Sequence, residues 1–275
     1  MATWYFLAEI FNLSAHRFIE SKELHMSMTH LVDLRTAEFN CVRRFFRSGL
    51  SVLEIGGGTG FQASLIARTG ATVESIDVAF PSAGDTYYPV QIYDGKTFPF
   101  PDKSFDVVFS SNVLEHIPDL EVILSEIQRV VKPDGCVIHV VPTSVWRIWT
   151  SFSHYLNLTK RFMDLIRRKH RSPKTELTNI DSSLCSSSIW GVIKRTLIAG
   201  PHGESPSAIS ELWYFSRWRW RKLFERAGFG QVEDWSSGIF YTGYSVFPSI
   251  SIEKRQKIAG VLGSATRIFI LRKIP

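Results

Sequence analysis

Residues 51–77, SVLEIGGGTGFQASLIARTGATVESID, decide the fold. The stretch opens on a short apolar run with β-branched residues, 51–55, which predicts a buried strand. A glycine-rich turn follows over 56–60, and then a segment with helical spacing that ends at Gly70, a residue typical of helix C-termini. A second strand is predicted over 72–77. This strand–turn–helix–strand order predicts two parallel strands.

The same alternation continues along the chain. We expect further strands at 88–92, 105–110, 136–141, 231–235 and 267–272, and helices at 120–131 and 216–227. The KPDG segment, residues 132–135, is predicted as a stop and turn between a helix and a strand. Alternating strands and helices over the first 140 residues predict an α/β fold with a doubly wound sheet.

The glycine turn has the composition of a ligand-binding turn. Glycines let the chain leave a strand sharply and let a ligand approach the backbone, and the next helix presents free N–H groups. Asp77, at the end of the second strand, is placed to accept the hydroxyls of a ribose. A turn that binds nothing is the alternative, and the order of strand, turn, helix, strand and acid weighs against it.

A dinucleotide is the rival ligand for this turn. Its fingerprint is G-x-G-x-x-G, but the third glycine comes one residue early here, as Gly60 after Gly56 and Gly58. Glu54, two residues before the first glycine, would repel a pyrophosphate. The same carboxylate suits a ligand that carries an ammonium and a sulfonium group.

Taken in order, the motifs resemble those of class I methyltransferases that depend on S-adenosylmethionine (SAM), of the methyltransferase type 11-like family. The matching residues are 52–60, Asp77, 93–95, 98–108, 111–117 and 132–135. The resemblance covers roughly residues 45–142, with weaker agreement over 216–272. It implies a Rossmann-like sheet of seven strands whose last strand is antiparallel, with 231–235 and 267–272 as the final two.

The resemblance also implies a SAM site. Gly56, Gly58 and Gly60 would wrap the methionine part of the cofactor. Glu54 would help to hold that turn and the amino group, and Asp77 would bind the ribose hydroxyls. These assignments make the chain a SAM-dependent methyltransferase by expectation, in which the sulfonium methyl is already activated and the protein chiefly aligns the acceptor.

Three more positions complete the implied cofactor site. Asp94 would face the adenine amino group, and Gly95 would allow the close approach of the ring. Asn112 lies where the fourth main strand of the family opens onto the cofactor. We expect no metal, because the sequence shows no Cys/His cluster and its three cysteines are far apart.

Histidines are the candidate general bases. His116, after the fourth main strand, is the first candidate, although the same position is also compatible with a structural role. His202 is the second, on a loop where Glu204 could hold one tautomer, or alternatively as a solvated surface residue. His154 and Tyr155 could line an acceptor pocket. His139 falls inside a predicted strand, which favours a core position.

The domain organisation is predicted as an N-terminal helical lid or extension, 1–45, and a methyltransferase domain, 46–275. An insert at about 143–215 would carry the acceptor site. Within it, aromatic residues recur every three positions, at Trp146, Trp149, Phe152 and Tyr155. A basic cluster follows: Lys160, Arg161, Arg167, Arg168, Lys169 and Arg171. This pattern favours either contact with an anionic membrane or with RNA, or a cap helix with a solvated basic face.

Charge is uneven along the chain, whose net charge is +6. Residues 51–144 carry −7, with 12 acidic and 5 basic side chains, and residues 145–225 carry +8, with 14 basic and 6 acidic. The apolar segment 3–13 is interrupted by Glu9 and follows no basic region, so we expect no signal peptide. The expected location is cytoplasmic, with peripheral membrane contact as an extension.

Three functions remain open from the sequence. The leading hypothesis is methyl transfer to a small-molecule or glycan-like acceptor, with lipid-linked and anionic acceptors included. An RNA methyltransferase is the second hypothesis, and it requires a continuous basic groove. The third is a catalytically silent scaffold that binds SAM without an aligned acceptor. The oligomeric state is left undetermined.

Overall fold

The computed structural model describes residues 20–79, 86–171, 202–204, 206–243 and 249–274. Seven strands in this part of the chain form one sheet in the order β3-β2-β1-β4-β5-β7-β6. The strands are β1 (Ser51–Ile55), β2 (Thr72–Asp77), β3 (Gln91–Ile92), β4 (Phe105–Ser111), β5 (Val131–Pro142), β6 (Phe229–Ser236) and β7 (Thr266–Lys273). The order reverses between β1 and β4, and ligands of doubly wound sheets bind at such a reversal.

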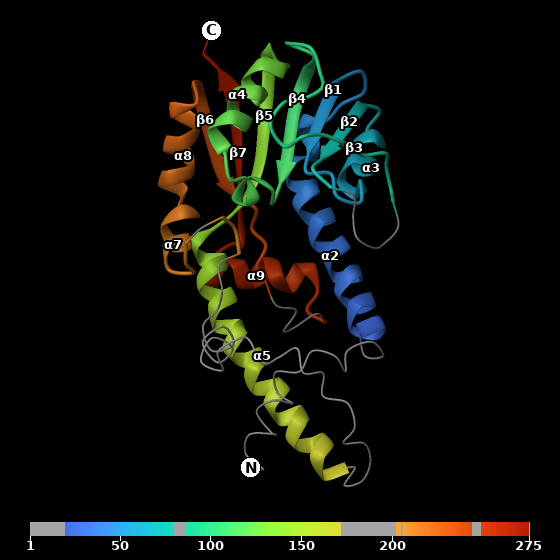
Figure 1. The fold of residues 1–275 in the computed structure, drawn as a ribbon, viewed down its shortest axis with the longest axis vertical. Helices are drawn as coiled ribbons and strands as arrows, with labels where there is room; N and C mark the ends of the chain where they lie inside the picture. The colour runs from blue at the N-terminus through green and yellow to red at the C-terminus, as the bar shows by residue number, and fades with distance from the viewer. Residues whose placement is uncertain (1–19, 80–85, 172–201, 205, 244–248, 275) are drawn as a thin grey trace, which may run out of the picture.

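Helices alternate with these strands (Figure 1). They are α2 (Glu20–Val42), η2 (Arg43–Phe45), α3 (Phe61–Ala67), η3 (Leu114–His116), α4 (Leu120–Val130), α5 (Ser144–Arg171), α7 (Ser210–Tyr214), α8 (Arg217–Arg226) and α9 (Ile252–Leu262). Local sequence explains where two of them begin. The side chains of Ser216 and Ser251 accept the N–H groups of Arg219 and Lys254, which caps α8 and α9.

The strand directions confirm the expected topology. β1 pairs in parallel with β2 and β4, and β4 pairs in parallel with β5. β7 pairs antiparallel with both β5 and β6, so the last strand is the antiparallel one. The fold is therefore a Rossmann-like α/β sheet of seven strands.

Successive side chains of a strand point to opposite faces of the sheet, so the apolar residues of the strands pack into two cores. Leu53 and Ile55 of β1 lie in the core that includes residues of α4 and α8. Val52 lies in the other, with residues of α3 and the C-terminal part of α2, including Phe39. Full burial of each Leu, Ile or Phe side chain contributes about 1.5–3 kcal/mol. Two covered faces explain why β1 reads as a continuous apolar run interrupted only by Glu54.

Two local predictions were wrong. Residues 132–135 do not form a turn between a helix and a separate strand, because they lie inside β5. Val131 pairs with Phe105 and Cys136 pairs with Val107, so the four residues between them bulge out of the ladder. The predicted strand 88–92 is reduced to Gln91–Ile92.

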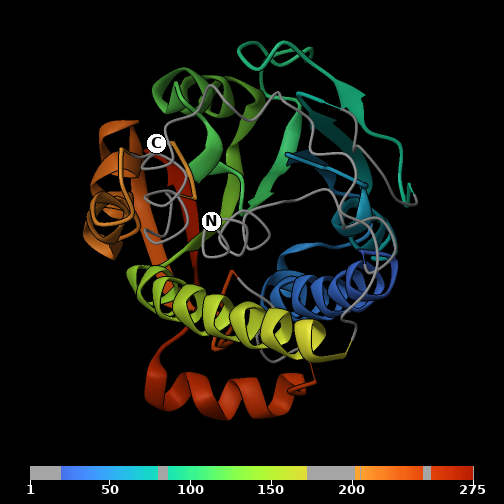
Figure 2. The same ribbon diagram turned by 60° about the horizontal axis from the view of Figure 1, so that its bottom comes forward.

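The carboxyl ends of the parallel strands are covered by helices. In Figure 1, α2, α5 and α9 lie beyond that end of the sheet, and Figure 2 shows the same helices from below. Phe39 and Val42 of α2 and Phe46 are buried against the sheet, so this part of the N-terminal segment packs on the main domain. None of the described helices combines the length and hydropathy needed to cross a membrane.

The aromatic positions of the insert do lie on a helix, α5, but they do not share one environment. Trp146 is buried, whereas Phe152 and Tyr155 are 56% and 51% exposed. The difference arises because α5 leaves the body of the protein as it extends away from β5 (Figure 1). The side chains of the basic cluster at 160–171 lie outside the described residues, so its contact with a membrane or RNA stays a prediction.

Candidate functional site

The glycine turn lies directly on the carboxyl end of β2. The N–H groups of Gly56 and Gly57 donate to the carbonyl of Ile76, at 2.8 and 3.1 Å. Gly56 has a φ of +75°, and a Cβ there would lie 2.3 Å from a methyl carbon of Val113. Gly60 also has a φ of +75°, and its Cβ would lie 2.4 Å from the carbonyl oxygen of Tyr88. Only glycine fits these two positions.

Asp77 holds the middle of this turn. Its carboxylate accepts the N–H of Gly58 at 2.8 Å and the N–H of Val78 at 2.6 Å. Gly58 itself has a φ of +54°, and a Cβ there would meet no atom within 4 Å. The turn therefore leaves open space at Gly58, whose N–H contacts the carboxylate of Asp77.

A cavity of about 280 Å³ borders the turn. It is lined by Leu31, Val32, Arg35, Gly56, Gly57, Gly58, Thr59, Phe61, Gln62, Tyr87, Ser111, Asn112 and Val113. It therefore lies between α2 and the carboxyl ends of β1 and β4. A second cavity, of about 550 Å³, lies around Lys103, Asp106 and residues 132–136, at the amino ends of the strands. Ligands of doubly wound sheets bind at the carboxyl ends, so we assign the cofactor to the smaller cavity.

Glu54 supports the turn from inside the core. It is buried and accepts a hydrogen bond from the hydroxyl of Ser75 at 2.6 Å. A Cβ on Gly57 would lie 2.0 Å from that hydroxyl oxygen, so turn and carboxyl pack tightly. Burial raises the pKa of Glu54 to about 7, and the hydrogen bond from Ser75 opposes this shift.

Glu54→Gln is expected to change how stability depends on pH. A carboxyl with a raised pKa stabilises the fold while protonated, and this contribution is lost as pH rises from about 4.5, the ordinary value, to about 7. The wild type should therefore lose about 2–3 kcal/mol relative to Glu54→Gln between roughly pH 5 and 8.5. Urea unfolding of both proteins at the two pH values measures this difference. An equal change in the free energy of unfolding of the two proteins between these pH values would show that Glu54 is ionised in the folded protein.

Asp94 and Gly95 follow β3 in a turn at the edge of the site. The exposed carboxylate of Asp94 accepts the N–H groups of Thr97 and Lys96 at 2.7 and 2.8 Å, which lowers its pKa. The N–H of Tyr93 donates to the carbonyl of Asp77 at 3.0 Å, so this turn adjoins the end of β2. Neither Asp94 nor Gly95 lines the cavity, and their contact with adenine stays a prediction.

A buried carboxylate on α2, that of Glu38, contacts two residues that line the cavity, Arg35 and Asn112. Glu38 is fully buried and accepts from Arg35 at 2.6 Å, from the hydroxyl of Tyr241 at 2.7 Å and from Thr266 at 2.9 Å. The side-chain amide of Asn112, which lines the cavity, approaches Glu38 at 3.4 Å. The sequence analysis missed this network. The available signal was a charged residue on the apolar stripe of a helix, four positions from both Leu34 and Val42.

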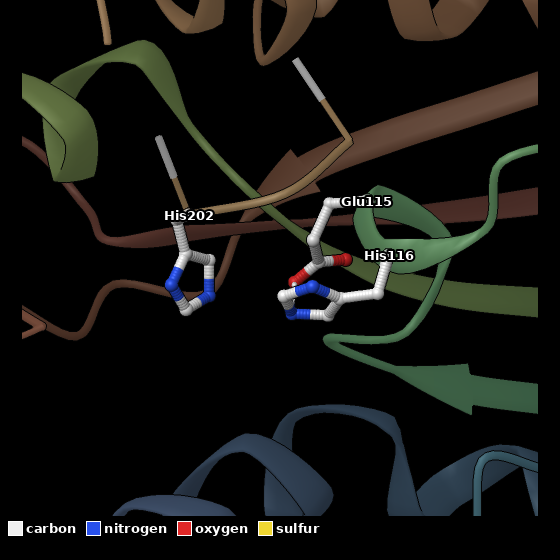
Figure 3. Close-up of side chains that lie close together, drawn as sticks. All are labelled: Glu115, His116 and His202. Atoms are coloured by element: carbon white, nitrogen blue, oxygen red, sulfur yellow. Dashed lines mark ion pairs between the residues drawn. The ribbon is translucent and has the colours of Figure 1, made fainter. Parts of the chain in front are cut away.

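The two candidate bases, His116 and His202, lie together although they are far apart in sequence (Figure 3). Their ring centroids are 4.8 Å apart. Glu115 lies beside the two histidines, and one of its carboxyl oxygens is 3.9 Å from Nε2 of His116. Val113, on the same segment, lines the cavity. The cluster Glu115–His116–His202 therefore follows the end of β4, starting two residues after Val113, but none of its three members lines the cavity itself.

The loop that carries His202 is held in place by buried charge. The N–H groups of His202 and Gly203 donate to Glu211 at 2.6 and 2.8 Å, and Arg147 forms a buried ion pair with Glu211 at 3.1 Å. The N–H of Glu204 donates to the carbonyl of Glu115 at 3.0 Å. The loop is therefore held by Glu211 and by the backbone of Glu115, and the role of the Glu204 carboxylate in holding one tautomer of His202 stays a prediction.

Burial shifts all three groups of the cluster toward their neutral forms. Burial raises the pKa of Glu115 to about 8. Burial, and after it His116 and the positive charges of Arg147 and Arg35, together lower the pKa of His202 to about 4. Burial also lowers the pKa of His116. The two imidazoles are thus neutral at pH 7, with lone pairs available to a ligand.

The other histidines named from the sequence lie elsewhere. His139 is fully buried in β5, bonded to the hydroxyl of Ser110 at 2.8 Å and stacked on Phe224, which confirms the core assignment. His154 and Tyr155 contact each other on α5, with ring centroids 5.5 Å apart. They do not line the 280 Å³ cavity.

Comparisons with known proteins agree with this geometry. A family model described as a methyltransferase domain matches residues 53–139. An uncharacterised methyltransferase of Mycolicibacterium paratuberculosis is 30% identical over 188 residues, which cover 63% of this chain and 69% of that protein. Phosphoethanolamine N-methyltransferase 2 of Caenorhabditis elegans is 34% identical over 110 residues, covering 35% of this chain and 25% of that protein.

The matches to other proteins are partial. The chain spans about half, 54%, of the length of further curated relatives that it matches. Among solved structures, a SAM-dependent methyltransferase from Archaeoglobus fulgidus is 17% identical, with 88% of this chain and 94% of that chain covered and a TM-score of 0.49.

Proposed function

Because the chain belongs to the class I SAM-dependent methyltransferases, we propose that it methylates a small-molecule acceptor bound beside the Glu115–His116–His202 cluster. The observation that carries this proposal is the position of the cluster. The segment that carries Glu115 and His116 also carries Val113, which lines the cofactor cavity, and the cluster brings together two imidazoles from separate segments with ring centroids 4.8 Å apart.

The glycine cradle fits the cofactor. Gly56 and Gly60 have no room for a side chain, and Gly58 faces open space, as a backbone wrapped around a ligand requires. When bound, SAM supplies a methyl group on a sulfonium. The chain's own contribution is the turn held by Asp77, the wall formed by α2, and the placement of the acceptor.

The acceptor half of the site needs a proton acceptor, because a hydroxyl or an ammonium group is a nucleophile only after it loses a proton. His116 and His202 are the residues we propose for this activation. A small molecule is favoured over RNA because one relative is named for phosphoethanolamine, a small acceptor. Glycan-like, lipid-linked and anionic small acceptors remain within this proposal.

Asp77→Ala is expected to weaken SAM binding. The change removes the charged acceptor of the Gly58 N–H and the carboxylate proposed for the ribose. A charged hydrogen bond contributes about 1.5–3 kcal/mol, so the Kd should rise roughly 10- to 100-fold. Calorimetric titration with SAM and S-adenosylhomocysteine measures this. No binding by the wild-type protein would overturn the proposed function.

His116→Ala and His202→Ala are each expected to lower kcat by about 10²-fold while the Kd for SAM stays within about twofold of wild type. The rate is followed as S-adenosylhomocysteine release over a panel of phosphoalcohols, amines, phenols and sugar nucleotides. An equal loss of SAM affinity in these variants would place the histidines in the cofactor site. Unchanged kcat in both would remove them from the reaction.

A further inference from the structure

We propose that Glu115, His116 and His202 together bind one divalent transition-metal ion. The side chains converge from two segments, η3 and the loop at 202–204 (Figure 3). Each offers one ligand atom, and the three atoms lie within 4.8 Å of one another. Two imidazole nitrogens and one carboxylate are a ligand set typical of Zn²⁺ sites that keep a coordination position open. The sequence analysis expected no metal. It could not identify this ligand set, because His202 lies far from Glu115 and His116 in the sequence.

The carboxyl of Glu115 is the observation that points to a ligand. Its side chain is fully buried, yet neither oxygen has a hydrogen-bond partner in another residue among those described. An unpaired buried polar group costs about 1–3 kcal/mol, and buried carboxylates are normally paired or bound to a metal. A cation bound between Glu115 and the two imidazoles would give the unpaired carboxyl group of Glu115 a partner.

The distances require only a small adjustment of the rings. Four ligands around Zn²⁺, at bonds of about 2.0–2.2 Å, lie about 3.4 Å apart. The side chain of His116 is 45% exposed, and Figure 3 shows the imidazoles of His116 and His202 near the carboxyl group of Glu115. Rotation of these rings about their side-chain bonds can therefore close the set without a change of backbone.

The backbone contacts between the two segments, and the charges near Glu115, also favour a metal ion at this site. The N–H of Glu204 donates to the carbonyl of Glu115, and a Cβ on Gly203 would lie 2.3 Å from that oxygen. The two ligand-bearing segments are thus fixed against each other. The positive charge of Arg35 acts on the Glu115 carboxyl, but Arg35 is already paired with Glu38 at 2.6 Å.

The metal would act on the acceptor, a role that rests on the proposed function. A hydroxyl oxygen that takes the open position loses its proton to water more readily, because the cation stabilises the resulting anion. That oxygen then forms a bond to the methyl carbon as the carbon–sulfur bond breaks, and the electron pair leaves with sulfur as a neutral thioether. The site therefore predicts a hydroxyl-bearing acceptor.

Titration of chelator-treated, tag-free protein with Co²⁺ tests the site without SAM or an acceptor. Zn²⁺ competition and elemental analysis give the stoichiometry. We expect one Co²⁺ per chain, with the absorption spectrum of a tetrahedral complex. Glu115→Gln, His116→Ala and His202→Ala should each weaken binding at least about 10-fold, since removal even of groups that support metal ligands costs 10- to 100-fold.

His154→Ala is the matched control, because it removes a histidine outside the cluster and should retain the affinity for Co²⁺. SAM titration of every variant shows that its fold persists. Binding of Co²⁺ by the wild type that is no tighter than binding by the His116→Ala/His202→Ala double variant overturns the metal site. That result leaves the proposed function intact, because neutral histidines can then act as bases. Conversely, Co²⁺ binding without SAM binding overturns the proposed function alone.

Discussion

Glu38→Ala is expected to lower the free energy of unfolding by about 3–5 kcal/mol. The change leaves three donors without their shared buried acceptor: Arg35, Tyr241 and Thr266. Of these, Arg35 carries a charge, which is costly to bury without a counter-ion. Since each kcal/mol shifts the Tm of a domain of this size by about 2–4 °C, the Tm should fall by roughly 6–20 °C.

The cavity should respond as well, because Arg35 and Asn112 line it and both contact Glu38. SAM affinity of Glu38→Ala is therefore expected to fall together with its Tm. Tyr241→Phe is the matched control, since it removes one neutral donor and should cost only about 1 kcal/mol. Thermal unfolding and calorimetry of both variants make the comparison. A loss of under 1 kcal/mol in Glu38→Ala would contradict the importance of this network.

Glu211→Gln is the second change with a large expected effect, about 3–5 kcal/mol. The new amide oxygen can still accept the N–H groups of His202 and Gly203, so the main loss is the ion pair with Arg147. The charge of Arg147, which is buried, then loses its carboxylate partner. Urea unfolding is the direct measurement.

The double variant Arg147→Met/Glu211→Gln separates charge from packing. Replacing a buried ion pair by groups of similar volume is often neutral, so the double variant should recover most of the lost stability. Both this variant and Glu211→Gln should retain Co²⁺ binding, because the amide oxygen still accepts the N–H groups of the loop at 202–204. A double variant as unstable as Glu211→Gln alone would show that shape, and not the loss of the Arg147–Glu211 charge pair, accounts for the lower stability.

Both predictions concern residues that the sequence analysis did not select. Its local predictions nevertheless describe most of the sheet. The strand, the glycine turn, the helix and the place of Asp77 at the end of the second strand were predicted correctly. A strand's apolar run, a turn's glycines and a helix's period each depend on neighbours a few positions away. The bulge at 132–135 was missed for the same reason, since a proline and a glycine indicate a turn whether or not the chain rejoins the same strand.

By itself, the sequence determined the Rossmann-like sheet with its antiparallel last strand, the glycine cradle and the use of SAM. Only the tertiary structure decided which side chains meet. Glu38 reaches Tyr241 and Thr266, and Glu115 and His116 meet His202, across long separations in the chain. No local pattern encodes such a meeting, because it depends on how α2, η3 and the loop at 202–204 pack onto one end of the sheet. Hydrogen bonds within an element are set by nearby residues, whereas a buried charge is paired by whichever distant segment the packing brings to it.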